Sequence, residues 1–197
     1  MNFHVLHPAD QLCMMMERIY AFGMTTTSGG NLSIMDSDGD IWITPASIDK
    51  GTLTPDDIMQ VKPDGTVIGI HTPSVELPFH KQIYEKRPDI KAVLHAHPPA
   101  LVAYSSLNRK PLTEMIASVN YVCNNVKTAD YALPGSKTLS EKITREFEAG
   151  ADIVIMESHG VVLGAGNMFD AFMKFETLDY CARIEINAAP LGRSRVL

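Results

Sequence analysis

Cysteine is scarce in this chain of 197 residues, and the few that occur do not form a recognisable pattern. Cys13, Cys123 and Cys181 are far apart, odd in number and never part of a C-x-x-C pair. Their spacing indicates neither a thiolate zinc site nor a disulfide framework. This favours a reducing compartment, and we expect a cytoplasmic protein.

Long apolar runs and an excess of basic residues are also missing. No apolar stretch approaches 18 residues, so no membrane span is expected. The opening segment MNFHVLHPAD does not read as a secretory signal. With 17 basic and 23 acidic residues, the net charge is −6, which argues against nucleic acid as a partner. Neither G-x-G-x-x-G nor a Walker A loop occurs, so no nucleotide cofactor is expected.

The composition that remains is that of a globular protein. Hydrophobic residues make up 45% and charged residues 20% of the chain, which is enough to build a core without disulfides. No internal repeat, low-complexity tract or linker-like stretch interrupts it. We therefore expect a single domain over residues 1–197.

Periodicity predicts helices and strands in a mixed order. Thr54-Pro55 reads as a helix start, and Thr138-x-x-Glu141 as a capping box before a helix. Residues 108–135 show no clear pattern. The predicted helices cover 9–22, 77–87, 98–107, 139–149 and 168–188, the hairpins 32–44 and 58–70, and the remaining strands 90–97, 153–156 and 161–163. Because hairpins join most strands, a mainly antiparallel sheet with helices packed on it is expected.

Two histidines end a strand whose other residues are of the buried type. His95 and His97 are two residues apart, so they point to the same face of a strand, about 6.5–7 Å apart along the chain. Two imidazoles at that spacing can converge on one metal ion. The alternative is a pair of histidines on a solvated strand face. Because Pro98 and Pro99 end the strand at once, the pair lies where sites are often built.

A third ligand would have to come from elsewhere in the chain. His159 is the best candidate, because apolar strands on both sides of its turn fix its direction. Three histidines would leave a coordination position open for substrate or water. The alternative for His159 is an ordinary turn histidine. His80 falls on a predicted helix, and Glu76 reads as a charge at a helix N-terminus, which spacing does not connect to the histidines.

Five short motifs then occur in order over about residues 10–185. In this order and with these spacings, they resemble the class II aldolase/adducin family, the group that includes fuculose-1-phosphate aldolase. The motifs are Ser28-Gly29-Gly30-Asn31-Leu32-Ser33, Ile43-Thr44-Pro45, Pro73-Ser74-Val75-Glu76, His95-Ala96-His97 and His159-Gly160.

The resemblance implies a three-layer α/β/α sandwich around a mainly antiparallel sheet. It implies one divalent metal ion per chain, most commonly Zn²⁺, held by His95, His97 and His159. The family's essential carboxylate falls on Glu76, which is expected to act as general acid/base. Whether Glu76 is also a fourth metal ligand in the resting enzyme is left open. Fourfold homotetramers are common in the family, so a homo-oligomer is expected.

The resemblance also implies a pocket for a substrate phosphate. Backbone N–H groups freed by glycine, with serine and asparagine side chains, suit a phosphate without a lysine. Val75 departs from the family, which has a second serine there. Lys50 is expected as a solvated loop lysine, with a place at the mouth of the site as the alternative. The predicted phosphate-binding residues are Ser28, Gly29, Gly30, Asn31, Ala46, Ser47 and Ser74.

The function expected from the resemblance is that of a zinc-dependent aldolase-type lyase. It would cleave a carbon–carbon bond in a sugar phosphate or related hydroxy-ketone through a metal-stabilised enediolate. A sibling reaction on a similar metal-chelating substrate is the alternative: dehydration, epimerisation or decarboxylation. A non-catalytic interaction domain, like the adducin head, is a third, against which the retained histidines and Glu76 argue.

Overall fold

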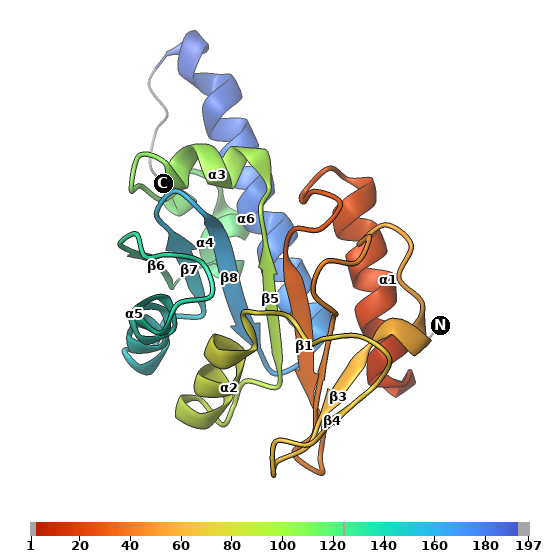
Figure 1. The fold of residues 1–197 in the computed structure, drawn as a ribbon. Coiled ribbons are helices and arrows are strands. Elements are labelled where there is room, and N and C mark those ends of the chain that lie inside the picture. Colours follow the sequence, from red (N-terminus) through yellow and green to blue (C-terminus); the bar gives the residue numbers. More distant parts are fainter. Residues whose placement is uncertain (1–2, 124, 193–197) are drawn as a thin grey trace.

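Eight strands form one sheet in the computed structural model, which describes residues 3–123 and 125–192 (Figure 1). The strand order is β4-β3-β2-β1-β5-β8-β7-β6, and all neighbours are antiparallel except β6 and β7. The strands are β1 (Asn31–Met35), β2 (Ile41–Ile43), β3 (Met59–Val61), β4 (Val67–Ile68), β5 (Ala92–Ala96), β6 (Val126–Ala129), β7 (Ile153–Met156) and β8 (Gly160–Ala165).

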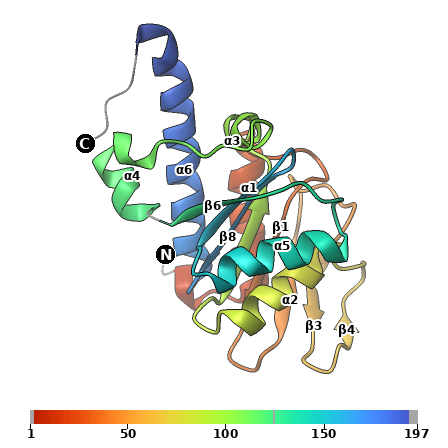
Figure 2. The ribbon, with the colours of Figure 1, turned by 90° about the vertical axis from the view of Figure 1, so that its left-hand side faces the viewer.

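Helices cover both faces of the sheet, which makes the three layers that the resemblance implies (Figure 2). Helices α2 (Leu77–Lys86) and α5 (Lys137–Glu148) pack together on one face. The other face is covered by α1 (Pro8–Ala21), α3 (Pro99–Ser105), α4 (Ala117–Val122) and α6 (Met168–Ala188). None of the helices in the described residues has the length and apolar character to cross a membrane.

The central strand β5 shows how the sequence builds two cores from one strand. Its side chains alternate between the faces, so Leu94 joins the core under α1 and α6, while Val93 joins the core under α2 and α5. Both residues are fully buried. A central strand with both faces covered consists mostly of apolar residues, and the predicted buried strand is confirmed. His95 therefore points toward the α2 side.

Several details of the sequence prediction were wrong or incomplete. The segment after Thr54 forms a single 3-10 turn, because the chain must enter β3 directly afterwards. Helix α5 is capped by Ser136, whose Oγ accepts from Leu139 N at 3.1 Å, so Thr138 lies inside the helix. Residues 108–135, which gave no prediction, contain α4 and the edge strand β6. Both elements are short, and in β6 only the first and last of its four residues are buried.

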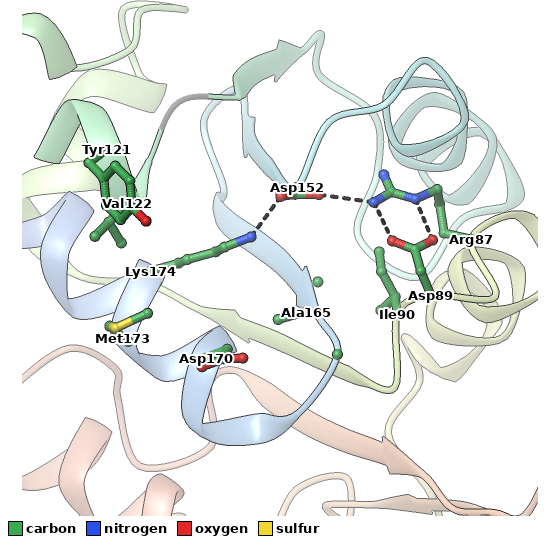
Figure 3. Close-up of a pocket in the computed structure, with 12 residues that line it drawn as sticks. Arg87, Asp89, Ile90, Tyr121, Val122, Asp152, Ala165, Asp170, Met173 and Lys174 are labelled. Carbon is green, nitrogen blue, oxygen red and sulfur yellow. Dashed lines mark hydrogen bonds and ion pairs between the residues drawn. The ribbon is translucent and has the colours of Figure 1, made fainter.

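A cavity of about 520 Å³ lies at the ends of β5 and β8 that are remote from the histidines. Figure 3 shows its charged wall, where Arg87 bridges Asp89 and Asp152 and Lys174 reaches Asp152 from α6. Arg87 also donates to the carbonyls of Phe147 and Ala151, and its hydrogen bond lowers the pKa of Asp89. These side chains satisfy one another, so the network ties α2 and β5 to α5, β7 and α6.

Candidate metal centre

His95 is fixed by the pairing of β5 with β8. The register places His95 opposite Val162 and Ala96 opposite Val161. The Nδ1 of His95 lies 2.9 Å from the carbonyl oxygen of Val161, so Nδ1 carries the proton and donates it to that acceptor. The other nitrogen, Nε2, is therefore left with a free lone pair. A metal-binding histidine is commonly held in this way by a carbonyl group behind it.

His159 reaches the same place from the turn between β7 and β8. Met156 pairs with Gly160, so the three residues between them form a tight loop, in which Ser158 has a φ of 54°. Gly160 allows this loop to press against the end of β5, because a Cβ there would lie 2.6 Å from the carbonyl oxygen of Ala96. The predicted turn between two buried strands is confirmed.

The three predicted histidines form one cluster. The Nε2 atoms of His95 and His97 are 3.0 Å apart, and one ring nitrogen from each histidine lies within 4.8 Å of the others. Burial, with the nearby His159 as a further cause, lowers the pKa of His95 to about 3. Burial and its two histidine neighbours lower the pKa of His97 to about 3, and burial lowers that of His159. At neutral pH the rings are thus uncharged, as metal ligation requires.

Glu76 joins this cluster, although spacing alone could not connect it. Its Oε2 lies 3.2 Å from His95 Nε2 and accepts a hydrogen bond from Asn31 Nδ2 at 2.8 Å. Its Oε1 lies 3.6 Å from His159 Nε2 and has no hydrogen-bond partner among the described residues. The carboxylate is 6% exposed. One oxygen is therefore held by the protein and the other is left for a ligand.

These residues fit a divalent metal ion. One ring nitrogen of each histidine lies within 4.8 Å of the others, beside a buried carboxylate oxygen that has no hydrogen-bond partner among the described residues, and a cation among these atoms would satisfy them. Three nitrogen donors and one oxygen donor are the ligand types that zinc prefers. The cluster can therefore hold a metal.

The pocket in front of the cluster has a volume of about 240 Å³. All seven residues predicted for phosphate binding line it, together with Glu76, His97 and His159. Gly30 has a φ of 71°, and a Cβ there would lie 2.7 Å from the carbonyl oxygen of His95, so glycine brings the loop against the histidine strand. Both ends of the Asn31 amide are already hydrogen-bonded, to Glu76 and to His80.

The expectation for Lys50 was wrong. Its side chain is not solvated: Lys50 is 1% exposed and lines the same pocket. Its backbone N–H donates to Thr27 at 2.8 Å, which ties the segment after β2 to the segment before the glycine loop. Its Nζ donates to the carbonyl of Pro45. Burial lowers the pKa of Lys50 to about 8.

Sequence reasoning also missed His80 and Tyr84 as part of the site. Both are buried beside Glu76 on α2. The signal was present, because Glu76, His80 and Tyr84 are each four residues apart and so lie on one face of a helix.

Comparison with known proteins agrees with this geometry. A model of the class II aldolase and adducin N-terminal domain matches residues 10–186. The chain belongs to this family. Its members use a divalent metal, and the histidine cluster lies where such an ion could bind.

Three relatives illustrate the range of the family. A 5-deoxy-D-ribulose 1-phosphate aldolase of Bacillus thuringiensis serovar kurstaki is 31% identical over 92% of this chain and 85% of its own. A 3-oxo-tetronate 4-phosphate decarboxylase of Haemophilus influenzae is 29% identical over 84% of this chain and 80% of its own. A solved L-fuculose 1-phosphate aldolase superposes with a TM-score of 0.85 and 29% identity, over 96% of this chain and 90% of that chain.

Proposed function

We propose that this chain is a metal-dependent lyase that breaks a carbon–carbon bond beside the carbonyl of a small phosphorylated hydroxy-ketone. The observation that carries the proposal is the convergence of three neutral imidazoles and the partnerless Oε1 of Glu76 at one pocket. The relatives support it, since the aldolases and the decarboxylase are named for sugar phosphates or related phosphorylated acids. His95, His97 and His159 would hold the ion, which the family resemblance assigns as zinc.

Glu76 would handle the proton that the reaction must move. When bound, the metal would act as a Lewis acid on the substrate carbonyl. In a retro-aldol cleavage, the β-hydroxyl loses its proton as the bond breaks and an aldehyde leaves. The carbon next to the carbonyl must then gain a proton. Glu76 Oε1 is suited to deliver or accept it, because this oxygen has no other partner and the opposite oxygen is held by Asn31.

Lys50 supports an anionic substrate. A buried ammonium group has three donors, and Pro45 accepts from only one of them. The pocket that Lys50 lines also contains the hydroxyls of Ser47 and Ser74 and the backbone of the glycine loop. Val75 lines this pocket and is 68% exposed, but its side chain has no hydroxyl that could bind a phosphate. The ammonium group of Lys50 would instead provide a charged donor for the phosphate.

Decarboxylation is a second candidate for the same site, favoured by the similarity to 3-oxo-tetronate 4-phosphate decarboxylase. There too a bond beside the carbonyl breaks and the same carbon gains a proton. The two reactions differ only in the fragment that leaves, an aldehyde or carbon dioxide. The role of Glu76 is common to both.

A substrate panel tests the proposal. Purified protein with zinc or manganese is incubated with ketose phosphates, 3-oxo acid phosphates and their unphosphorylated counterparts, and aldehyde and carbon dioxide are measured. We expect turnover of phosphorylated compounds only in the presence of metal. The proposal would be rejected by turnover in the absence of metal. It would also be rejected if neither the ketose phosphates nor the 3-oxo acid phosphates were turned over.

The phosphate assignment is tested separately by Lys50→Met. We expect KM for the phosphorylated substrate to rise about 10–100-fold, because a charge-assisted contact is lost. KM for an unphosphorylated analogue should change little. Lys137→Met is the control, since Lys137 is exposed and pairs with Glu141 away from the pocket. An equal effect of both variants would remove Lys50 from substrate binding.

The homotetramer, the cytoplasmic location and the single domain over 1–197 stay predictions, as does the absence of nucleic acid among the partners.

A further inference from the structure

Buried polar side chains form the contact between β1 and α2, a position where a strand and a helix usually pack through apolar side chains. On β1, Asn31 and Ser33 are two residues apart and share a face. Glu76, at the N-terminal boundary of α2, and His80 and Tyr84 on the helix are each four residues apart and also share a face. All five are buried. The two elements therefore bring together polar groups that must find partners in each other.

The five side chains form one continuous series of hydrogen bonds. Tyr84 OH lies 2.6 Å from Ser33 Oγ, and Ser33 Oγ lies 2.7 Å from His80 Nδ1. His80 Nε2 lies 2.6 Å from Asn31 Oδ1. Asn31 Nδ2 donates to Glu76 Oε2 at 2.8 Å. The series runs without a break from Tyr84 in the last turn of α2 to the carboxylate at the pocket.

The donors in this series all point toward Glu76. Because Asn31 donates through Nδ2, its Oδ1 must accept, so His80 carries its proton on Nε2. Burial lowers the pKa of His80 well below its ordinary value, so the ring is neutral and Nδ1 is an acceptor. Ser33 then donates to Nδ1 and accepts from Tyr84. This arrangement satisfies every contact.

We propose that Tyr84, Ser33 and His80 are positioning residues for the carboxylate of Glu76 and act through the amide of Asn31. The inference rests on the proposed role of Glu76 as acid/base. A reversed amide would turn its oxygen toward the carboxylate, and the N–H of His80 prevents this reversal. Oε2 stays bound, and Oε1 stays free to meet the substrate.

Mutation of the remote hydroxyls tests the inference without touching the pocket. In Ser33→Ala, His80 loses the donor that fixes its tautomer, and we expect kcat to fall about 10–100-fold, as for residues behind a metal ligand. KM and metal content should not change. Tyr84→Phe removes only the last donor and should lower kcat about 3–10-fold. If Ser33→Ala does not fold, the kcat of Tyr84→Phe tests the inference in its place.

Thr144→Val is the matched control. Thr144 is a buried residue of α5 whose Oγ1 lies 3.0 Å from Oε1 of Gln82 on α2, outside the series. It should lower stability but leave kcat unchanged. His80→Gln, whose amide can still donate to Asn31, should retain more of kcat than His80→Leu. If Ser33→Ala and Thr144→Val have the same kcat, or if His80→Gln is no better than His80→Leu, the positioning role is wrong.

The tautomer of His80 in the metal-free protein tests the inference without an activity assay. We expect ¹⁵N NMR to show that the His80 ring is neutral and protonated at Nε2. The signal of this ring should be absent from His80→Gln and shifted in Ser33→Ala. A ring protonated at Nδ1 in the wild type would overturn the inference. If the tautomer is as expected but no substrate reacts, the proposed function fails while the orientation of the series stands.

Discussion

Polar clusters lie at both ends of β5 and β8, and they differ in how their groups are paired. At one end, Arg87 and Lys174 bind Asp89 and Asp152, and these charges compensate one another (Figure 3). At the other end, Glu76 Oε1 and His159 Nδ1 are buried without a partner among the described residues. The larger cavity is at the paired end, yet the features of a site are at the other.

The comparison shows that size and charge alone do not mark a site. A network in which each charge has an oppositely charged partner holds elements together, and at this end no buried side-chain atom lacks a partner among the described residues. Thr25 Oγ1, beside the glycine loop, is another buried atom near the histidine pocket that has no partner in the part of the chain that the structure describes. Unused polar atoms that converge are the better guide, and the following predictions test the two ends against each other.

The largest effect is expected from His95→Ala. Loss of the central imidazole should lower metal content from about one ion per chain to almost none, with at least about 10³-fold loss of activity. Elemental analysis of the purified protein measures the metal. His71→Ala, which removes a histidine paired with Asp57 away from the cluster, should retain the ion. Metal retention in His95→Ala would refute the ligand assignment.

Glu76→Gln should separate turnover from metal binding. The amide keeps the shape but cannot exchange the proton, so kcat should fall about 10²–10⁴-fold with metal still bound. Steady-state kinetics on metal-analysed protein measures this. Glu157→Gln is the control, because Glu157 lies in the same turn as His159 but accepts a hydrogen bond from Tyr131 N. Unchanged kcat in Glu76→Gln would remove Glu76 from the mechanism.

Acid should destabilise the metal-free protein through the histidine end. His95 and His97 have a folded-state pKa of about 3, whereas the unfolded chain binds their protons below about pH 6.5. The free energy of unfolding should therefore fall as pH drops from about 6.5 toward about 3, by up to about 1.4 kcal/mol per unit for each histidine. Urea unfolding of chelator-treated protein measures the slope. In His95→Gln, the free energy of unfolding should depend less steeply on pH. The same pH dependence in the wild type and the variant would contradict the prediction.

The smallest effect is expected at the paired end. Asp152→Asn weakens the hydrogen bonds to Arg87 and Lys174 and should lower stability by about 1–3 kcal/mol, with kcat/KM unchanged. Denaturant unfolding and the standard activity assay measure the two quantities. Asp38→Asn, in an exposed turn, should change neither. Loss of activity without loss of stability would mean that this end takes part in function.

The sequence predicted most elements that are long or form a continuous apolar run, such as the long helix α6 and the strand that becomes β5. It did not predict α4 or β6, because short elements at the edge of a sheet have too few residues to show a period. It misplaced the cap of α5, since Ser136 and Thr138 are both good capping residues and only the path of the chain selects one.

For the site, the sequence by itself determined that His95 and His97 face the same way, because side chains two apart on a strand must do so. The apolar strands around its turn made His159 the best candidate for a third ligand, and the motif resemblance supplied Glu76. Only the tertiary structure decided that Asn31 lies opposite His95, that Lys50 is buried in the pocket, and that His80 reaches Glu76 through Asn31. Local spacing follows from covalent geometry, whereas these contacts depend on strand register and helix docking, which the whole core sets.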